Sequence, residues 1–272
     1  MVDRLWLLLV TYLYINNILY WGGDTLNIVE LNNVDVEFYT IKSEIKVLNN
    51  LNIKVKEGEI VCLVGPSGCG KSTILNLISG LLKPTHGEIV VNGKCGYMFQ
   101  KDNLFEWRTV YKNVMLGLEL TKQCNEENKK RALDLLDKYG LLEFKDYYPS
   151  QLSGGQRQRV ALIRTLLLDP DILLLDESFS ALDFQTRLLV NEDVYKIIKE
   201  EKKTAIIITH DISEAISMGD RVLVLSSRPS FVKSIYDINL GINGDRTPFK
   251  SRDSVEFKNY FQSIWKEMNK GG

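Results

Sequence analysis

Short apolar runs recur along the chain and predict the strands of a buried sheet. Residues 59–64, 170–175 and 204–209 are rich in Val, Ile and Leu, and polar residues do not alternate with the apolar ones. An unbroken apolar run of this length is typical of a strand that is covered on both faces of a parallel sheet. Residues 95–99 predict a further strand, and residues near 231–236 resemble a last one.

Elsewhere the apolar residues have helical spacing. Residues 126–139 combine alternating charges with an apolar stripe and stop at Gly140, a residue common at helix ends. Residues 73–79 and 160–168 also predict helices. Near the C-terminus, a further stripe predicts a terminal helix packed on the core, with a partner surface as the alternative. It consists of Phe257, Tyr260, Phe261, Ile264, Trp265 and Met268.

The turn after residues 59–64 predicts a phosphate-binding site. Its sequence fits the pattern G-x-x-x-x-G-K-[ST] and lies between a predicted strand and a predicted helix, which disfavours a chance glycine-rich turn. Glycines let several N–H groups converge on an anion, and the helix N-terminus adds partial positive charge. Lys71 would lie near the β- and γ-phosphates, and Ser72 would offer its hydroxyl to Mg²⁺. We expect a nucleoside triphosphate to bind at Gly65, Pro66, Ser67, Gly68, Cys69, Gly70, Lys71, Ser72 and Thr73.

A second segment also suits an anion. Ser153 is a good helix N-cap and is followed by Gly154, Gly155 and Gln156, ahead of the helix predicted at 160–168. Two glycines remove side chains that would block a ligand at the helix start. By itself, the segment fits a flexible loop before a capped helix equally well.

Two carboxylates and a histidine follow buried strands. Asp176 and Glu177 come directly after the second long run, where α/β sheets bind ligands. We expect Asp176 to hold Mg²⁺ and Glu177 to polarise the attacking water as a general base. His210 follows the third run and could contact the γ-phosphate or hold the water and Glu177 in place. The alternatives are a pair of surface acids and a structural histidine. The other histidine, His86, lies in a turn sequence and is assigned no role.

In their order along the chain, these motifs resemble the ATPase subunit of an ABC transporter. The P-loop is followed by Gln100, Leu-Ser-Gly-Gly-Gln at 152–156, the two carboxylates, Ser-Ala-Leu-Asp at 180–183 and His210. The resemblance implies an α/β fold, namely a P-loop NTPase with a mixed sheet core, an antiparallel β subdomain and a helical signature subdomain.

The resemblance also implies how two copies cooperate. In this family two subunits sandwich two ATP molecules, so Ser153, Gly154, Gly155 and Gln156 would contact the γ-phosphate of the ATP on the other copy's P-loop. Asp183 would couple the two sites. Gln100 would reach Mg²⁺ and the attacking water and would sense the membrane partner.

An aromatic ring that stacks on adenine is expected near a first strand in this family. Residues 33–39 offer Phe38 and Tyr39, and Phe38 is favoured.

Residues 99–114 narrow the subfamily, because they are similar to the corresponding stretch of nitrate/sulfonate/taurine-type importers. Pro-Trp-Arg-Thr-Val is usual there, whereas this chain has Glu106 in place of the proline, which predicts a less rigid loop. Trp107 and Arg108 would offer an apolar contact and a cation to a permease. The alternative is that Trp107 packs within the helical subdomain. Ser178 also replaces a usual proline, but both carboxylates remain, so activity should survive.

Composition limits the remaining possibilities. A chain of 272 residues with 44% hydrophobic content can bury one sizeable core with a subdomain, and its net charge of −1 argues against a nucleic-acid partner. Four cysteines without paired spacing fit a reducing cytoplasm. We expect an apolar leader at 1–25, an ABC ATPase domain at 26–240 with a helical subdomain at about 101–168, and a helical extension at 241–272. Residues 1–25 are interpreted as the product of a start codon assigned too far upstream. The alternative is an anchor at the membrane interface.

Together these features predict the ATP-hydrolysing, energy-coupling subunit of a bacterial ABC importer. The solute would be small, such as nitrate, a sulfonate, taurine or a thiamine-precursor pyrimidine. A homodimer would use ATP and Mg²⁺ at the cytoplasmic face of the membrane, with an integral-membrane permease and an extracytoplasmic solute-binding protein. The alternative is a soluble ABC ATPase of translation or DNA repair. A single P-loop and the short interval between Gln100 and Ser153 disfavour it.

Overall fold

The computed structural model describes residues 27–39, 44–180, 182–242 and 244–270. The interpretation of residues 1–25 as a leader therefore lies outside the described residues. Within the described ranges, no helix combines the length and the apolar character that crossing a bilayer requires.

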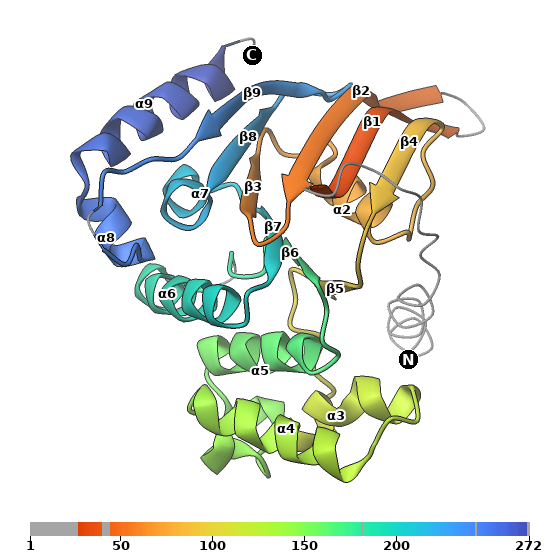
Figure 1. Ribbon diagram of the computed structural model, residues 1–272, viewed down its shortest axis with the longest axis vertical. Coiled ribbons are helices and arrows are strands. Elements are labelled where there is room, and N and C mark those ends of the chain that lie inside the picture. The colour runs from red at the N-terminus through yellow and green to blue at the C-terminus, as the bar shows by residue number, and fades with distance from the viewer. Residues whose placement is uncertain (1–26, 40–43, 181, 243, 271–272) are drawn as a thin grey trace.

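A six-stranded sheet forms the centre of the molecule (Figure 1). Its strand order is β5-β6-β7-β3-β8-β9, and all neighbouring strands are parallel except β8 and β9. All five runs predicted as strands lie in this sheet. The strands are β3 (Ile60–Val64), β5 (Cys95–Met98), β6 (Ile172–Asp176), β7 (Thr204–Ile208), β8 (Arg221–Leu225) and β9 (Val232–Asp237).

Both faces of this sheet are covered, which explains why its strands are apolar throughout. In β3, Cys62 and Val64 pack into one hydrophobic cluster with residues of the helices, whereas Val61 and Leu63 pack into a second cluster. Because side chains alternate along a strand, each strand contributes to both clusters.

A three-stranded antiparallel sheet covers the second cluster together with helix α2 (Lys71–Ile78). Its order is β2-β1-β4, with β1 (Asn27–Tyr39), β2 (Glu44–Lys56) and β4 (His86–Val91). Together with the helical layers, the two sheets confirm the predicted α/β fold with a mixed core sheet and an antiparallel β subdomain.

Between β5 and β6 the chain forms a separate layer of helices, which lies below the sheet in Figure 1. The helix predicted over 160–168 begins earlier, at Gly154, because the capping by Ser153 already starts it there. The elements of this layer are α3 (Val110–Leu120), α4 (Glu126–Lys138), α5 (Gly154–Leu166) and the short 3₁₀ helices η1 (Leu142–Phe144) and η2 (Pro149–Gln151).

The remaining helices are α6 (Phe184–Glu200), α7 (Ile212–Met218), α8 (Pro248–Asp253) and α9 (Val255–Asn269). In α9, Ile264 is fully buried, and most of the predicted apolar stripe is partly buried against the main cluster. Trp265 differs from the expectation, since it is 57% exposed and stacks on Phe261 instead of the core. The stripe is therefore wider than the surface on which the helix packs.

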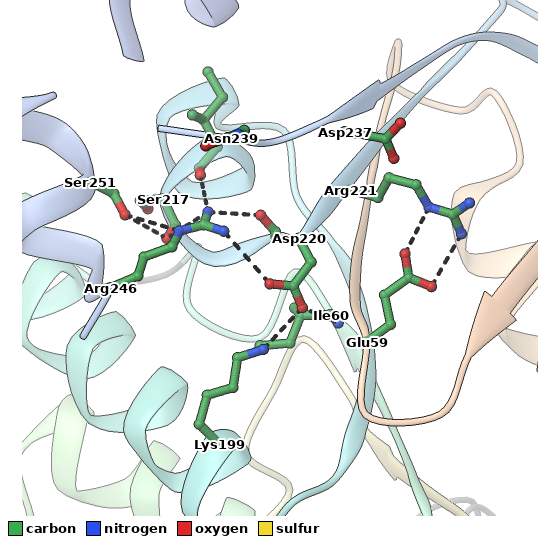
Figure 2. Close-up of polar contacts among 12 residues, drawn as sticks. Glu59, Ile60, Lys199, Ser217, Asp220, Arg221, Asp237, Asn239, Arg246 and Ser251 are labelled. Carbon is green, nitrogen blue, oxygen red and sulfur yellow. Dashed lines mark hydrogen bonds and ion pairs between the residues drawn. The ribbon is translucent and has the colours of Figure 1, made fainter. Parts of the chain in front are cut away.

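Arg246 anchors the two C-terminal helices to the sheet layer (Figure 2). Its Nη2 donates to the carbonyl oxygens of Ile216 and Gly219, both at 2.7 Å, at the end of α7. Its Nη1 lies 3.6 Å from the Asp220 carboxylate, which also accepts a hydrogen bond from Lys199 of α6 at 2.9 Å. A cation at a helix C-terminus satisfies carbonyl groups that otherwise have no partner within the helix.

We expect the substitution Arg246→Met to lower the free energy of unfolding by about 1–3 kcal/mol, because it leaves buried carbonyl oxygens unpaired. Denaturant unfolding followed by circular dichroism measures the change. Lys258→Met on the exposed side of α9 is the matched control and should leave stability within about 0.5 kcal/mol. Equal stability of the two variants would contradict the anchoring role.

Candidate functional site

The P-loop joins β3 to α2, and its last glycine has two structural roles. Gly70 adopts a φ of 114°, in the left-handed region that disfavours other residues. A Cβ at this position would lie 2.9 Å from Cγ1 of Val47 and 3.0 Å from Cδ2 of Leu48. Because no side chain caps α2, the first N–H groups of this helix can bind an anion. The helix begins at Lys71, two positions before the predicted start.

The Lys71 side chain lies against the P-loop, whose phosphate ligand it is predicted to bind. This side chain is largely buried, and its Nζ donates to the carbonyl oxygens of Gly65 at 2.9 Å and Pro66 at 3.0 Å. Among the described residues, no carboxylate lies within ion-pair distance of this ammonium group, so its charge can bind an incoming phosphate. On the outer side of the loop, Arg228 donates to the carbonyl oxygen of Gly68, a contact that the sequence did not suggest.

Asp176 ends β6 and reaches Ser72 in the first turn of α2. Its Oδ1 accepts from the Ser72 hydroxyl at 3.1 Å, and its Oδ2 accepts from the Tyr97 hydroxyl at 3.2 Å. Burial raises the pKa of Asp176, and the two hydrogen bonds partly oppose this rise. Sequence reasoning missed Tyr97, because an aromatic residue in a buried strand is usually part of the core.

The Ser72 and Asp176 pair fits the ligand chemistry of Mg²⁺. Both residues offer hard oxygen atoms, and Mg²⁺ is commonly held by one or two such groups together with phosphate and water oxygens. Across the described part of the chain, no three His, Cys, Asp or Glu side chains gather in a way that could hold a metal. An ion here would therefore depend on the nucleotide for further ligands.

Glu177 and His210 lie side by side at the ends of β6 and β7. Oε2 of Glu177 is 3.6 Å from Nδ1 of His210, and both side chains are partly open to solvent. Glu177 has a φ of 45°, an uncommon value for a residue other than glycine, and its N–H donates to the carbonyl oxygen of Ile208 at 3.0 Å. Strained backbone of this kind is found where a side chain must be held in a set direction.

Two serines connect the segment after Glu177 to neighbouring strands. The Ser178 hydroxyl is buried and donates to the carbonyl oxygen of Met98 at the end of β5, at 3.1 Å. This hydrogen bond fixes Ser178, at the position where the resemblance leads us to expect a proline. Gln100 donates to the Ser180 hydroxyl at 3.4 Å. The structure thus brings Gln100 to the segment that follows Glu177, and its amide contacts Ser180 instead of Asp176 or Ser72.

The signature residues form the start of α5. Ser153 Oγ accepts from the N–H of Gln156 at 3.3 Å, and the Gln156 side chain accepts from the N–H of Ser153 at 2.8 Å, which is a capping box. A Cβ at Gly154 would lie 2.9 Å from Leu182, so this glycine also permits close packing against the segment before α6. Among the described residues, no hydrogen bond or ion pair joins the signature to the P-loop.

Asp183 caps α6 within its own chain. Its Oδ1 accepts from the N–H of Thr186 at 3.0 Å, and hydrogen bonds with Thr186 lower the pKa of Asp183. The neighbouring Phe184 and Leu189 expose 63% and 59% of their surface. The exposed Phe184 ring, next in the chain to the predicted coupling residue, is accessible to a partner surface.

The two aromatic residues that are candidates for stacking on adenine lie at the end of β1. Phe38 and Tyr39 are both exposed, and they point to opposite faces of the strand. The Tyr39 hydroxyl donates to Glu37, whereas the Phe38 ring makes no such bond. Residues 40–43, which follow directly, lie outside the described part of the chain.

Trp107 lies in the loop before α3. It is 64% exposed, and its ring packs 4.6 Å from that of the buried Phe105, so one part of the side chain contacts the core while most of it stays accessible. Arg108 is already paired, since its Nη2 donates to both carboxylate oxygens of Glu119 at 2.6 Å. The surface around Trp107 is therefore more apolar and less cationic than the sequence suggested.

Asn113, which sequence reasoning missed, fixes the loop that carries Trp107. Its fully buried amide accepts from the N–H of Phe105 at 2.7 Å and donates to the carbonyl oxygens of Phe105, Arg108 and Thr109. These bonds order the loop without the proline that Glu106 replaces.

The loop after Gln100 is also bonded to the signature helix. Arg164 is partly buried and donates to the carbonyl oxygens of Asp102 at 2.7 Å and Asn103 at 2.9 Å, while Arg157 Nε lies 3.1 Å from the Asp102 carboxylate. Burial lowers the pKa of Arg164 to about 10.

Comparison with known proteins places these features in a family. A family profile described as ABC transporter matches residues 48–180. An uncharacterised ABC transporter ATP-binding protein, YtlC of Bacillus subtilis, is 40% identical over 90% of this chain and 96% of its own. The nitrate import ATP-binding protein NrtD of Synechocystis is 40% identical, covering 88% of this chain and 93% of that protein. The taurine import ATP-binding protein TauB of Pelagibacter ubique is 41% identical, covering 80% of this chain and 87% of that protein.

A solved structure agrees with these relatives. The dimeric post-hydrolysis state of the ATP-binding cassette MJ0796, bound to ADP and Pi, is 37% identical with a TM-score of 0.67. The match covers 78% of this chain and 99% of that one. The fold, the P-loop and the sequence relatives agree, and the chain belongs to the ATP-binding, ATP-hydrolysing proteins of ABC transporters.

Proposed function

We propose that this chain hydrolyses ATP as one half of a homodimer and drives solute import through a membrane permease. The observation that carries the proposal is the neighbouring order of β5, β6, β7 and β3. Gln100, the Asp176–Glu177 pair, His210 and the P-loop each follow one of these parallel strands. The carboxyl ends of parallel strands share one edge of the sheet, so these groups surround a single ligand site.

Each group has a distinct role in hydrolysis. Lys71 and the N–H groups of the P-loop bind the phosphates, and Ser72 and Asp176 would hold Mg²⁺, which neutralises phosphate charge when bound. Glu177 polarises the attacking water as a general base. His210 orients this water and Glu177, to which its ring lies close.

The signature acts in a dimer. Its residues lie in the helical layer and, within the described ranges, have no polar contact with the P-loop of the same chain, so the anion that α5 can accept belongs to the site of a second copy. The exposed Phe184, next to Asp183 in the chain, supports an interface there. That MJ0796, a structural relative, is a dimer supports this arrangement.

Import of a small solute agrees with the relatives. The named relatives import nitrate or taurine, itself a sulfonate, and the transported solute here belongs to the same group or is a thiamine-precursor pyrimidine. The solute would be delivered by an extracytoplasmic binding protein. The ATPase pair would lie peripherally at the cytoplasmic face, with the surface around Trp107 against the permease. The alternative of a soluble translation or repair ATPase has no support among these relatives.

Substitution of Glu177 by Gln should separate binding from turnover. We expect ATP affinity to stay within about threefold and turnover to fall by about 10²–10⁴-fold, because the general base is lost. Light scattering should then show an ATP-bound dimer. Glu143→Gln, in the helical layer, is the control with normal turnover. Normal hydrolysis by Glu177→Gln would remove this residue from the role of base.

Mixing two inactive variants tests whether the signature acts in the partner's site. Lys71→Ala destroys the P-loop and Ser153→Arg blocks the signature, so neither homodimer should hydrolyse ATP. Their heterodimer keeps one intact combination of P-loop and signature, and an equal mixture should recover up to about a quarter of wild-type turnover. No recovery in a mixture that forms heterodimers would argue against a shared site.

Trp107 and Trp265 provide a matched pair of exposed tryptophans on different layers. Trp107→Ala should weaken the association with the permease by about tenfold or more, because exposed aromatic residues often dominate interfaces. Trp265→Ala should not change it, and basal ATP hydrolysis should be normal in both. Co-purification from membranes and ATPase stimulation measure the effect, and equal behaviour of the two variants would exclude docking through Trp107.

A further inference from the structure

Glu214 is a buried carboxyl group that the proposed reaction does not use. It lies in the first turn of α7 and is only 6% exposed. Burial raises the pKa of this carboxyl, and a hydrogen bond from Thr209 opposes the rise. A buried carboxyl group is costly unless partners satisfy it, and an apolar side chain of similar size would fill the same space without that cost.

Thr209 links this carboxyl to the turn that carries His210. The Thr209 side chain is buried, and its hydroxyl donates to Oε2 of Glu214. Oγ1 of Thr209 also accepts a hydrogen bond from the N–H of Asp211 at 3.0 Å. The Thr209 hydroxyl therefore joins residues 209 and 211, which flank His210. Glu214 fixes the direction of that hydroxyl.

The backbone on either side of His210 is held as well. The N–H of Thr209 donates to the carbonyl oxygen of Leu63 in β3 at 3.3 Å. Asp211 caps α7 by accepting from the N–H groups of Ser213 at 2.8 Å and Glu214 at 3.3 Å. His210 itself remains more than half exposed, so its side-chain direction depends on the turn and not on packing.

Groups from two other helices face the same cluster. Arg187 of α6 lies 3.9 Å from the Asp211 carboxylate, and Arg252 of α8 lies close enough to Asp211 and Glu214 for their charges to act on it. Asn191 of α6 is also buried beside Glu214. The cluster thus joins the His210 turn to α6 and to the C-terminal helices.

We propose that Thr209 and Glu214 form a positioning pair that directs His210 toward Glu177 and thereby sets the rate of hydrolysis. The inference rests on the proposed role of His210. Neither member of the pair touches the nucleotide or the reacting water. The pair acts because the Thr209 hydroxyl, held by Glu214, fixes the turn from which the imidazole reaches Glu177.

The test compares one substitution that removes the Thr209 hydroxyl group with one that keeps it. Thr209→Val keeps the shape of the side chain and removes the hydroxyl, whereas Thr209→Ser keeps the hydroxyl. We expect Thr209→Val to lower kcat by about 10–100-fold, as small misplacements of catalytic groups do, with the KM for ATP changed less than about threefold. Thr209→Ser should return kcat to within about threefold of wild type. Thr209→Ala also removes the hydroxyl and replaces Thr209→Val if that variant does not fold.

The His210 imidazole provides a second readout, because the chain has only two histidines. In an imidazole NMR spectrum of the full chain, the His210 signals are those missing in His210→Ala. They should shift in Thr209→Val but not in Thr209→Ser, while the His86 signals stay in place as an internal control. Unshifted His210 signals in Thr209→Val, or equal shifts in both variants, would overturn the inference.

The His210→Ala background separates this inference from the proposed function. Normal turnover of His210→Ala alone would refute the proposed role of His210. If its turnover is lost, Thr209→Val should cause no further loss in single-turnover measurements on His210→Ala. A further loss of the same size as in the wild-type background would mean that Thr209 acts elsewhere, and the positioning role would be rejected.

Discussion

The parallel hydrogen bonding of β6, β7 and β3 continues beyond the strands into the catalytic turns. Within the sheet, Asp176 pairs with Ile208, and Leu63 pairs with the same residue from the other side. One residue further on, Glu177 donates to the carbonyl oxygen of Ile208 and Thr209 donates to that of Leu63. The backbone of the predicted base and of the histidine turn is therefore fixed by sheet hydrogen bonds. A shift of β7 by one residue would separate Glu177 from His210 and reverse the faces of every buried side chain in the strand.

Three ionisable groups that are wholly or partly buried are bound by local partners. Lys71 is bound by carbonyl oxygens of its own loop, Asp176 by two hydroxyl groups, and Arg164 by carbonyl oxygens of the loop after Gln100. Hydrogen bonds to groups in such positions favour one arrangement over others, because a displacement leaves a polar group unpaired. In this protein such groups connect the sheet edge, the docking loop and the signature helix.

The central strands and the main motifs could be predicted because their signals are local. An apolar run of a few residues predicts a strand covered on both faces, and the residues that follow it must lie at the sheet edge. This reasoning gave the P-loop, the Asp176–Glu177 pair and the neighbourhood of His210. Tyr97, Asn113 and Arg246 could not be found in this way, because their roles depend on partners in other elements of the chain. The same holds for the pairing of Arg108 with Glu119 and for the contact of Gly154 with Leu182.

The capping box at the start of α5 has a consequence for assembly. Ser153 and Gln156 bond to each other's backbone, and Gly154 and Gly155 lie in the first turn of the helix. The surface that would meet a second subunit is thus already ordered in the free chain. Association then loses less conformational entropy than it would with a disordered tip, so more of the interaction energy with the nucleotide remains as affinity between the two copies.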